Sequence, residues 1–104
     1  MAFVDNLQAL PTVDNLAAIE LIDGNGQVVA RIENKPGQAG SLRVYAALAA
    51  KHGAINAAAA QEALDIYAEH TADARTNPGK HPNIDRLIDL LAQGLTLNAR
   101  TIAA

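Results

Sequence analysis

A chain of 104 residues is long enough to bury the core of one domain, and without cysteine it forms neither a disulfide nor a thiolate metal site. A formal net charge of -3 and 3% aromatic residues argue against a nucleic-acid partner, which requires basic surface and stacking rings. No signal-peptide pattern and no apolar run of transmembrane length is present. We therefore expect a cytoplasmic protein that does not bind membranes.

The first third of the chain predicts a short helix over residues 3–10, which Pro11 would stop, and then a β-hairpin over residues 15–33. Apolar and polar residues alternate along the second arm of the hairpin. The two arms are joined by the residues Asp-Gly-Asn-Gly at 23–26, and Asn-Gly is typical of hairpin turns. These features predict two antiparallel strands with one buried face.

The same turn partly matches an EF-hand calcium loop. Asp23, Asn25 and Gln27 occupy the first, third and fifth positions of such a loop. However, Val28 stands where glycine is required, and Asn34 stands where a bidentate glutamate is required. The pattern therefore favours a hairpin turn over a calcium site.

Three helices are predicted after the hairpin, over residues of about 41–52, 57–75 and 82–93. The residues that would start and end them are the N-caps Ser41 and Asn56, the first-turn Pro82, and the terminal glycines Gly53 and Gly94. Residues of about 95–102 alternate in part and predict a C-terminal strand that pairs with the hairpin. The predicted fold is a single α+β domain over residues 1–104, with a small antiparallel sheet packed by helices.

Two loops with the same residue types precede helix starts, at residues 34–41 and 77–83. Each contains Asn, Lys, Pro and Gly, and the start of a helix attracts anions through its dipole and its free N–H groups. If the loops meet at one edge of the sheet, they would form a pocket for a phosphate- or carboxylate-bearing ligand. Plain connecting turns would have the same composition, so both interpretations stay open. The candidate ligand-binding residues are Lys35, Gly37, Gly40, Ser41, His70, Lys80 and His81.

Several sharper motifs are absent from these segments. The spacing from Gly37 to Ser41 matches neither a P-loop nor a nucleophile elbow, so Ser41 is expected to be a helix cap. His70 has Tyr67 and Ile66 three and four positions before it, where a metal-binding helix would place ligands. We therefore predict no metal and no cofactor, and we expect His70 to hydrogen-bond a loop carbonyl.

Residues 34–41, Tyr45, residues 67–71 and residues 77–87 together resemble a family of short bacterial proteins of unknown function (domain of unknown function 2322). The resemblance extends over nearly the whole chain. It implies a bacterial, cytoplasmic, single-domain protein, and it brings no activity, cofactor or catalytic residue.

The sequence favours a non-enzymatic binding or regulatory module, because no catalytic set is assembled and the small apolar residues suit close helix contacts. Its expected partner is another protein, or a second copy that forms a homodimer through the sheet edge or the Ala-rich helix. The alternative is an enzyme or sensor for a small anionic ligand at the two loops, with His70 as a base.

Overall fold

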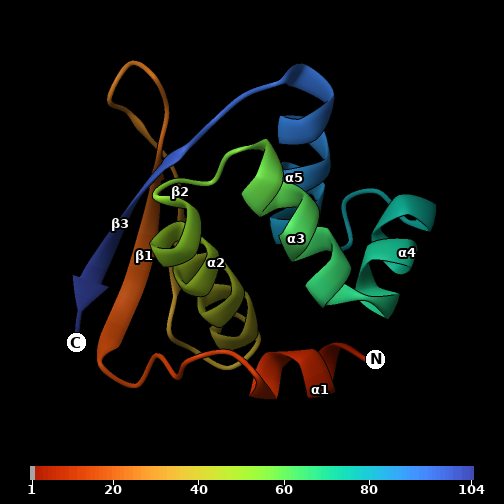
Figure 1. Ribbon diagram of the computed structural model, residues 1–104, viewed down its shortest axis with the longest axis horizontal. Helices are drawn as coiled ribbons and strands as arrows, with labels where there is room; N and C mark the ends of the chain where they lie inside the picture. The colour runs from red at the N-terminus through yellow and green to blue at the C-terminus, as the bar shows by residue number, and fades with distance from the viewer. Residues whose placement is uncertain (1) are drawn as a thin grey trace.

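The computed structural model describes residues 2–104, which fold into a three-stranded antiparallel sheet and a layer of helices (Figure 1). In chain order the elements are α1 (Phe3–Gln8), β1 (Leu16–Ile22), β2 (Val28–Glu33), α2 (Ala39–His52), α3 (Ala57–Tyr67), α4 (Glu69–Thr76), α5 (Pro82–Gln93) and β3 (Asn98–Ala103). The predicted α+β class and the antiparallel sheet are confirmed. The prediction of three helices after the hairpin is wrong, because residues 34–104 form four, α2 to α5.

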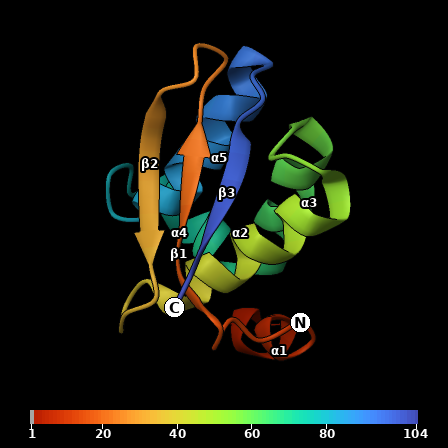
Figure 2. The same ribbon diagram turned by 90° about the vertical axis from the view of Figure 1, so that its left-hand side faces the viewer.

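The sheet has the strand order β2-β1-β3, so the C-terminal strand pairs with the first arm of the hairpin and places it at the centre. Figure 2 shows the sheet from its uncovered face, with the helices behind it. Glu20, at the centre of the sheet, pairs across both neighbours and accepts hydrogen bonds from Arg31 Nη1 and Arg100 Nε, each at 3.1 Å. The hydrogen bonds from Arg100 and Arg31 hold the pKa of Glu20 below its usual value. This charge cluster ties both edge strands to β1.

The turn between β1 and β2 is organised by Asp23. Its carboxylate accepts hydrogen bonds from the backbone N–H groups of Asn25 and Gln27, at 2.9 and 3.0 Å. Gly26 adopts a positive φ of 80°, which glycine tolerates without steric cost. The Asp23 carboxylate oxygen that would be a calcium ligand in an EF-hand loop therefore accepts hydrogen bonds within a hairpin turn.

Two element boundaries differ from the prediction. Helix α2 begins at Ala39, and its N-cap is Gln38, so the prediction that Ser41 caps this helix is wrong. The helix starts early because the N–H groups of Gln38 and Ala39 both bond to the carbonyl of Lys35. Strand β3 begins at Asn98 rather than about residue 95. The preceding Leu97 forms an isolated antiparallel bridge with the loop before α3.

Helix 57–75 of the prediction is broken at Ala68 into α3 and α4, and this break is imposed by contacts rather than by a helix-breaking residue. Ala68 has φ 51° and ψ -113°. Two carbonyls that a continuous helix would use are bonded elsewhere: Ile66 O accepts from Asn6 Nδ2 at 3.0 Å, and Leu64 O accepts from Thr71 Oγ1 at 2.6 Å. Helix α1 thus supplies a partner at the break, and the chain turns there.

We expect the substitution Ala68→Gly to raise the free energy of unfolding by about 0.5–1 kcal/mol. A positive φ costs an L-residue about 1–2 kcal/mol, and this relief exceeds the extra entropy that glycine gains in the unfolded chain. The matched control is Ala72→Gly, at an exposed position inside α4, which should cost about 1 kcal/mol. Urea unfolding of both variants is the measurement, and equal destabilisation by the two changes would contradict strain at Ala68.

One hydrophobic core lies between the sheet and helices α2, α3 and α5. Its largest fully buried side chain is Tyr45, and the core also includes Ile19 of β1, Leu64 of α3 and Leu87 of α5. None of the helices in residues 2–104 is long and apolar enough to cross a membrane. The core fixes the position of the start of α2 relative to the start of α5, and these two helix starts form the site described below.

Candidate functional site

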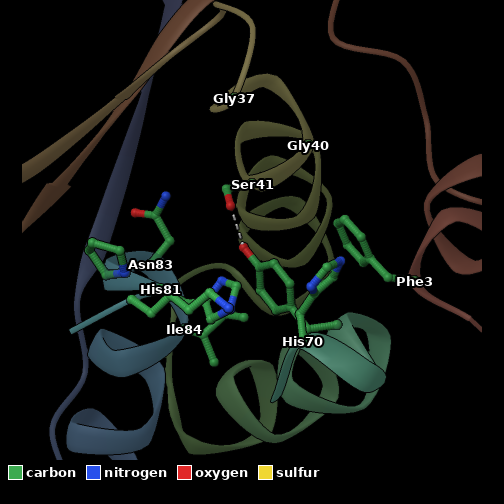
Figure 3. A pocket seen from close by; sticks show the side chains of 11 residues that line it. Phe3, Gly37, Gly40, Ser41, His70, His81, Asn83 and Ile84 are labelled. Carbon is green, nitrogen blue, oxygen red and sulfur yellow. Dashed lines mark hydrogen bonds between the residues drawn. The ribbon is translucent and has the colours of Figure 1, made fainter. Parts of the chain in front are cut away.

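A cavity of about 370 Å³ lies where the starts of α2 and α5 meet the α3–α4 junction, and we call it the helix-start pocket (Figure 3). Helix α1 closes one side of it through Phe3. Its lining residues are Phe3, Gly37, Gly40, Ser41, Tyr67, His70, Lys80, His81, Pro82, Asn83 and Ile84. The two loops that the sequence singled out therefore converge, because each leads into one of the helices whose starts form the pocket.

Most of the candidate residues line this pocket, and one does not. Gly37, Gly40 and Ser41 come from the first loop and the start of α2, and Lys80 and His81 come from the second loop. His70 of α4 lines the pocket as well. Lys35 is not among its lining residues and instead pairs with Glu33, at 3.4 Å between Nζ and Oε1.

The sequence reasoning missed the aromatic side of the pocket. Phe3 and Tyr67 stack with their ring centroids 5.1 Å apart, although Phe3 begins α1 and Tyr67 ends α3. The two residues lie far apart in the chain, and no local sequence pattern connects them. Asn83 and Ile84 were missed as well, although they stand directly after the loop that was singled out.

Ser41 is held by a buried phenol. Tyr67 donates a hydrogen bond from its hydroxyl to Ser41 Oγ, at 2.7 Å (Figure 3). Burial raises the pKa of Tyr67, so its hydroxyl stays protonated and acts as the donor in this pair. A serine hydroxyl that accepts one hydrogen bond keeps its own hydrogen for donation. Ser41 is therefore oriented as a donor at the pocket.

The starts of both helices leave backbone donors without partners. Among residues 2–104, no backbone or side-chain acceptor bonds the N–H groups of Gly40, Ser41 and Asn83. The first N–H groups of a helix have no intrahelical acceptor, and together with the helix dipole they favour an anion. All three residues line the helix-start pocket.

Asp73 of α4 holds the side chains of Lys80 and His81 in place at the pocket. Its Oδ2 accepts hydrogen bonds from His81 Nε2 at 2.6 Å and from Lys80 Nζ at 3.0 Å. The hydrogen bonds from His81 and Lys80 lower the pKa of Asp73 from 3.8 to about 2. An ionised carboxylate only accepts, so Nε2 of His81 carries a proton and Nδ1 is its other ring nitrogen.

Because the pKa of Asp73 is lower in the folded chain, Asp73 should stabilise the protein at neutral pH and lose this effect in acid. The stabilisation is complete above the ordinary pKa of 3.8 and disappears as the pH falls toward 2. We expect the unfolding free energy of the wild type to fall more steeply between pH 4 and pH 2 than that of Asp73→Asn. Urea unfolding across this range measures both slopes, and parallel curves would contradict the pairing.

His70 lies between two rings rather than against a carbonyl. Its ring is edge-on to Phe3, with centroids 5.1 Å apart, and tilted toward His81, with centroids 5.6 Å apart. No acceptor within residues 2–104 hydrogen-bonds its ring, so the prediction of a bond to a loop carbonyl is wrong. The strained turn at Ala68 directs the chain toward α1 and the second loop, and this places the His70 ring at the pocket (Figure 3).

The start of α5 is locked to α2 beneath the pocket. Tyr45 donates a hydrogen bond to the carbonyl of Asn83 and accepts one from Arg86 Nη1 at 3.3 Å. Arg86 also donates to Asn83 Oδ1 at 2.9 Å. Burial raises the pKa of Tyr45 to about 12, so the phenol remains a donor. The relative position of the two helix starts is thus held by buried and partly buried hydrogen bonds.

The described residues offer the pocket no metal-binding set. No group of three or more His and acidic side chains within residues 2–104 is arranged to hold a metal ion. His81 Nε2 and Lys80 Nζ are already engaged by Asp73. What the arrangement provides is hydrogen-bond donors: backbone N–H groups, one hydroxyl, an ammonium group and imidazole nitrogens.

Comparison with known proteins identifies the family. The family described as "Uncharacterized protein conserved in bacteria (DUF2322)" matches residues 3–101, so this chain belongs to that family. The search of curated proteins finds no match, and no solved structure matches either.

Proposed function

We propose that this DUF2322 member is a non-enzymatic cytoplasmic binding module that holds a small anionic ligand in the helix-start pocket. The observation that carries the proposal is the meeting of two helix starts, with unbonded N–H groups at Gly40, Ser41 and Asn83, in one cavity. Such donors favour phosphate and carboxylate groups. The ligand class is therefore a small molecule that bears one of these groups.

The attraction of the pocket for an anion comes from its backbone N–H donors and the Lys80 side chain together. The Nζ of Lys80 forms an ion pair with Asp73. An ammonium group has three hydrogens, and the hydrogen bond to Asp73 uses only one of them. The Lys80 side chain is 60% exposed, so the remaining hydrogens are available to a ligand. The pocket thus combines one cation with backbone dipoles, and Asp73 holds that cation in place.

The volume of the pocket bears on the size of the ligand. At about 370 Å³ it falls in the range of small-molecule sites, and it is larger than an inorganic phosphate needs. The stacked rings of Phe3 and Tyr67 form an apolar part of the lining, next to the donors of Gly40 and Ser41. This apolar part suits an organic portion attached to the anionic group.

Binding is favoured over covalent catalysis because Ser41 has no base. The hydroxyl of Ser41 bonds to the phenol of Tyr67, whose raised pKa makes it a donor rather than a proton acceptor. A nucleophilic serine requires an adjacent general base. His81, which lines the pocket and has a carboxylate partner, has its hydrogen bond to Asp73 and none to Ser41 among residues 2–104.

The test is a thermal-shift screen with phosphorylated and carboxylated metabolites at constant ionic strength, followed by calorimetry with the best compound. Saturating ligand should raise the melting temperature, as expected for about 3–4 kcal/mol of binding linkage. Lys80→Ala should weaken binding at least 10-fold, since a charge-assisted hydrogen bond is lost. The matched control is Lys35→Ala, which removes a lysine outside the pocket and should change affinity less than 2-fold.

Two results would contradict this proposal. One is the absence of any shift across the whole panel. The other is equal weakening by Lys80→Ala and Lys35→Ala, which would indicate attraction by net charge rather than by the pocket. Homodimerisation through the sheet edge or α3 stays a separate prediction, and size-exclusion chromatography with light scattering measures it.

A further inference from the structure

A second cavity, of about 580 Å³, lies on another side of α5, between this helix and the β1–β2 hairpin, and we call it the α5 groove. Its walls are the hairpin residues Asp23 and Val29 on one side and α5 with the loop after it on the other. The groove shares only Pro82 with the lining of the helix-start pocket. It is therefore a different surface from the proposed anion site.

The groove has an apolar floor that is partly open to solvent. Val29 is 51% exposed and Leu95 is 50% exposed, and both line the groove beside the buried Leu90 and Leu97. Single exposed apolar side chains are ordinary on protein surfaces, but here two of them face the same hollow. The buried leucines continue this apolar surface inward.

The rim of the groove carries three carboxylates against one guanidinium, so it is acidic overall. Asp23, Asp85 and Asp89 line it, and none of them forms an ion pair with any residue of 2–104. Arg86 is the one basic residue in the lining, and it is bonded to Asn83 and Tyr45. By contrast, Glu20, Glu33, Glu62 and Asp73 are each ion-paired with a basic side chain. The negative charge at the groove is thus available to a partner.

We propose that the α5 groove binds a short basic segment of a partner protein, with an aliphatic side chain in the hollow and lysine or arginine at the rim. Charge complementarity selects this occupant, because the three carboxylates repel nucleic acid and any acidic peptide. An aliphatic anchor matches the floor made by Val29, Leu95 and Leu97. A basic amphipathic segment satisfies both requirements at once.

The probe is a fluorescein-labelled 12-residue peptide of alternating lysine and leucine, measured by fluorescence anisotropy with the full chain. Two peptides serve as controls, one with leucine replaced by serine and one with lysine replaced by glutamate. We expect binding of the lysine–leucine peptide alone, and its affinity should fall as salt is raised. Equal binding of the lysine–serine peptide would overturn the proposal, since it would reduce the interaction to net charge. Absence of binding by the lysine–leucine peptide would overturn it as well.

Variants locate the binding on the molecule. The double variant Asp85→Asn with Asp89→Asn should bind the lysine–leucine peptide at least 10-fold more weakly. The asparagine at position 85 keeps an oxygen that can accept the hydrogen bond from the Gly79 N–H. The charge-matched control is Asp14→Asn with Asp65→Asn, at two exposed acids outside the groove, which should change affinity less than 2-fold. If the double variant at the groove does not fold, Asp89→Asn alone tests the same charge.

Leu95→Ser tests the apolar floor independently, because this side chain is half exposed and its loss should leave the fold intact. We expect at least 5-fold weaker peptide binding. Unchanged affinity in Leu95→Ser, or equal weakening by the two double variants, would place the peptide elsewhere on the surface and reject the α5 groove as its site.

Discussion

Tyr67→Ala should lower the free energy of unfolding by about 3–5 kcal/mol, the range for removing a buried aromatic ring. Tyr67 is 3% exposed and lies at the end of α3. A domain of this size is stable by about 5–15 kcal/mol, so the loss is a large fraction of the total. Urea unfolding followed by circular dichroism is the measurement.

The same substitution should also release α1. This helix has no buried residue of its own, and Phe3 stacks on the Tyr67 ring. The hydrogen bonds from Phe3 N to Glu69 and from Asn6 to Ile66 O remain. Hydrogen exchange in α1 should therefore rise well above that of α2, since the substitution removes the ring on which Phe3 packs.

The control for this prediction is Tyr67→Phe, which keeps the ring and removes the bond to Ser41. We expect it to cost only about 1 kcal/mol, the net worth of one hydrogen bond. If the phenylalanine variant were as unstable as the alanine variant, the hydroxyl rather than ring packing would hold this corner together.

Leu87→Ala should cost about 2–5 kcal/mol, since it opens a cavity in the core beside α5. Leu87 is 1% exposed, and with Ile84 and Leu90 it forms the buried face of α5. The consequence extends to both proposed sites, because the helix-start pocket and the α5 groove share α5 as a wall. We expect Leu87→Ala to weaken the binding of an anionic ligand in the helix-start pocket and of the lysine–leucine peptide in the α5 groove.

The matched control lies one turn along the same helix. Leu91 is half-buried, so Leu91→Ala removes the same atoms but buries less apolar surface, and it should cost at least about 1 kcal/mol less than Leu87→Ala. Chemical unfolding of both variants gives the comparison. Equal losses of unfolding free energy in the two variants would show that the burial of a leucine does not determine how strongly it anchors α5 to the core.

Local chemistry made several features predictable. Gly53 and Gly94 end α2 and α5 in the left-handed conformation, as expected of helix-terminal glycines, and Pro82 starts α5. Asn56 accepts a hydrogen bond from Ala59 N–H at 2.9 Å, as an N-cap does. Each of these depends on residues within one turn, so the sequence alone contains the cause.

Other features depend on residues far apart in the chain. Ala68 is a strong helix former, and nothing around it predicts a break; the break depends on Asn6, which bonds the Ile66 carbonyl from 60 positions away. Ser41 is not a cap, because the helix starts earlier in the chain. Its hydroxyl oxygen instead accepts a hydrogen bond from the hydroxyl of Tyr67. Propensity describes a segment in isolation, and these contacts override it.

Local residue patterns were sufficient to predict the α+β class, the hairpin, the C-terminal ends of α2 and α5, and the likeness of the two loops. Whether the two loops meet was decided only by the tertiary structure, which packs α5 on α3 and bonds its first turn to α2 through Tyr45. The physical reason is that composition dictates what a helix start attracts, whereas the buried core dictates which helix starts become neighbours.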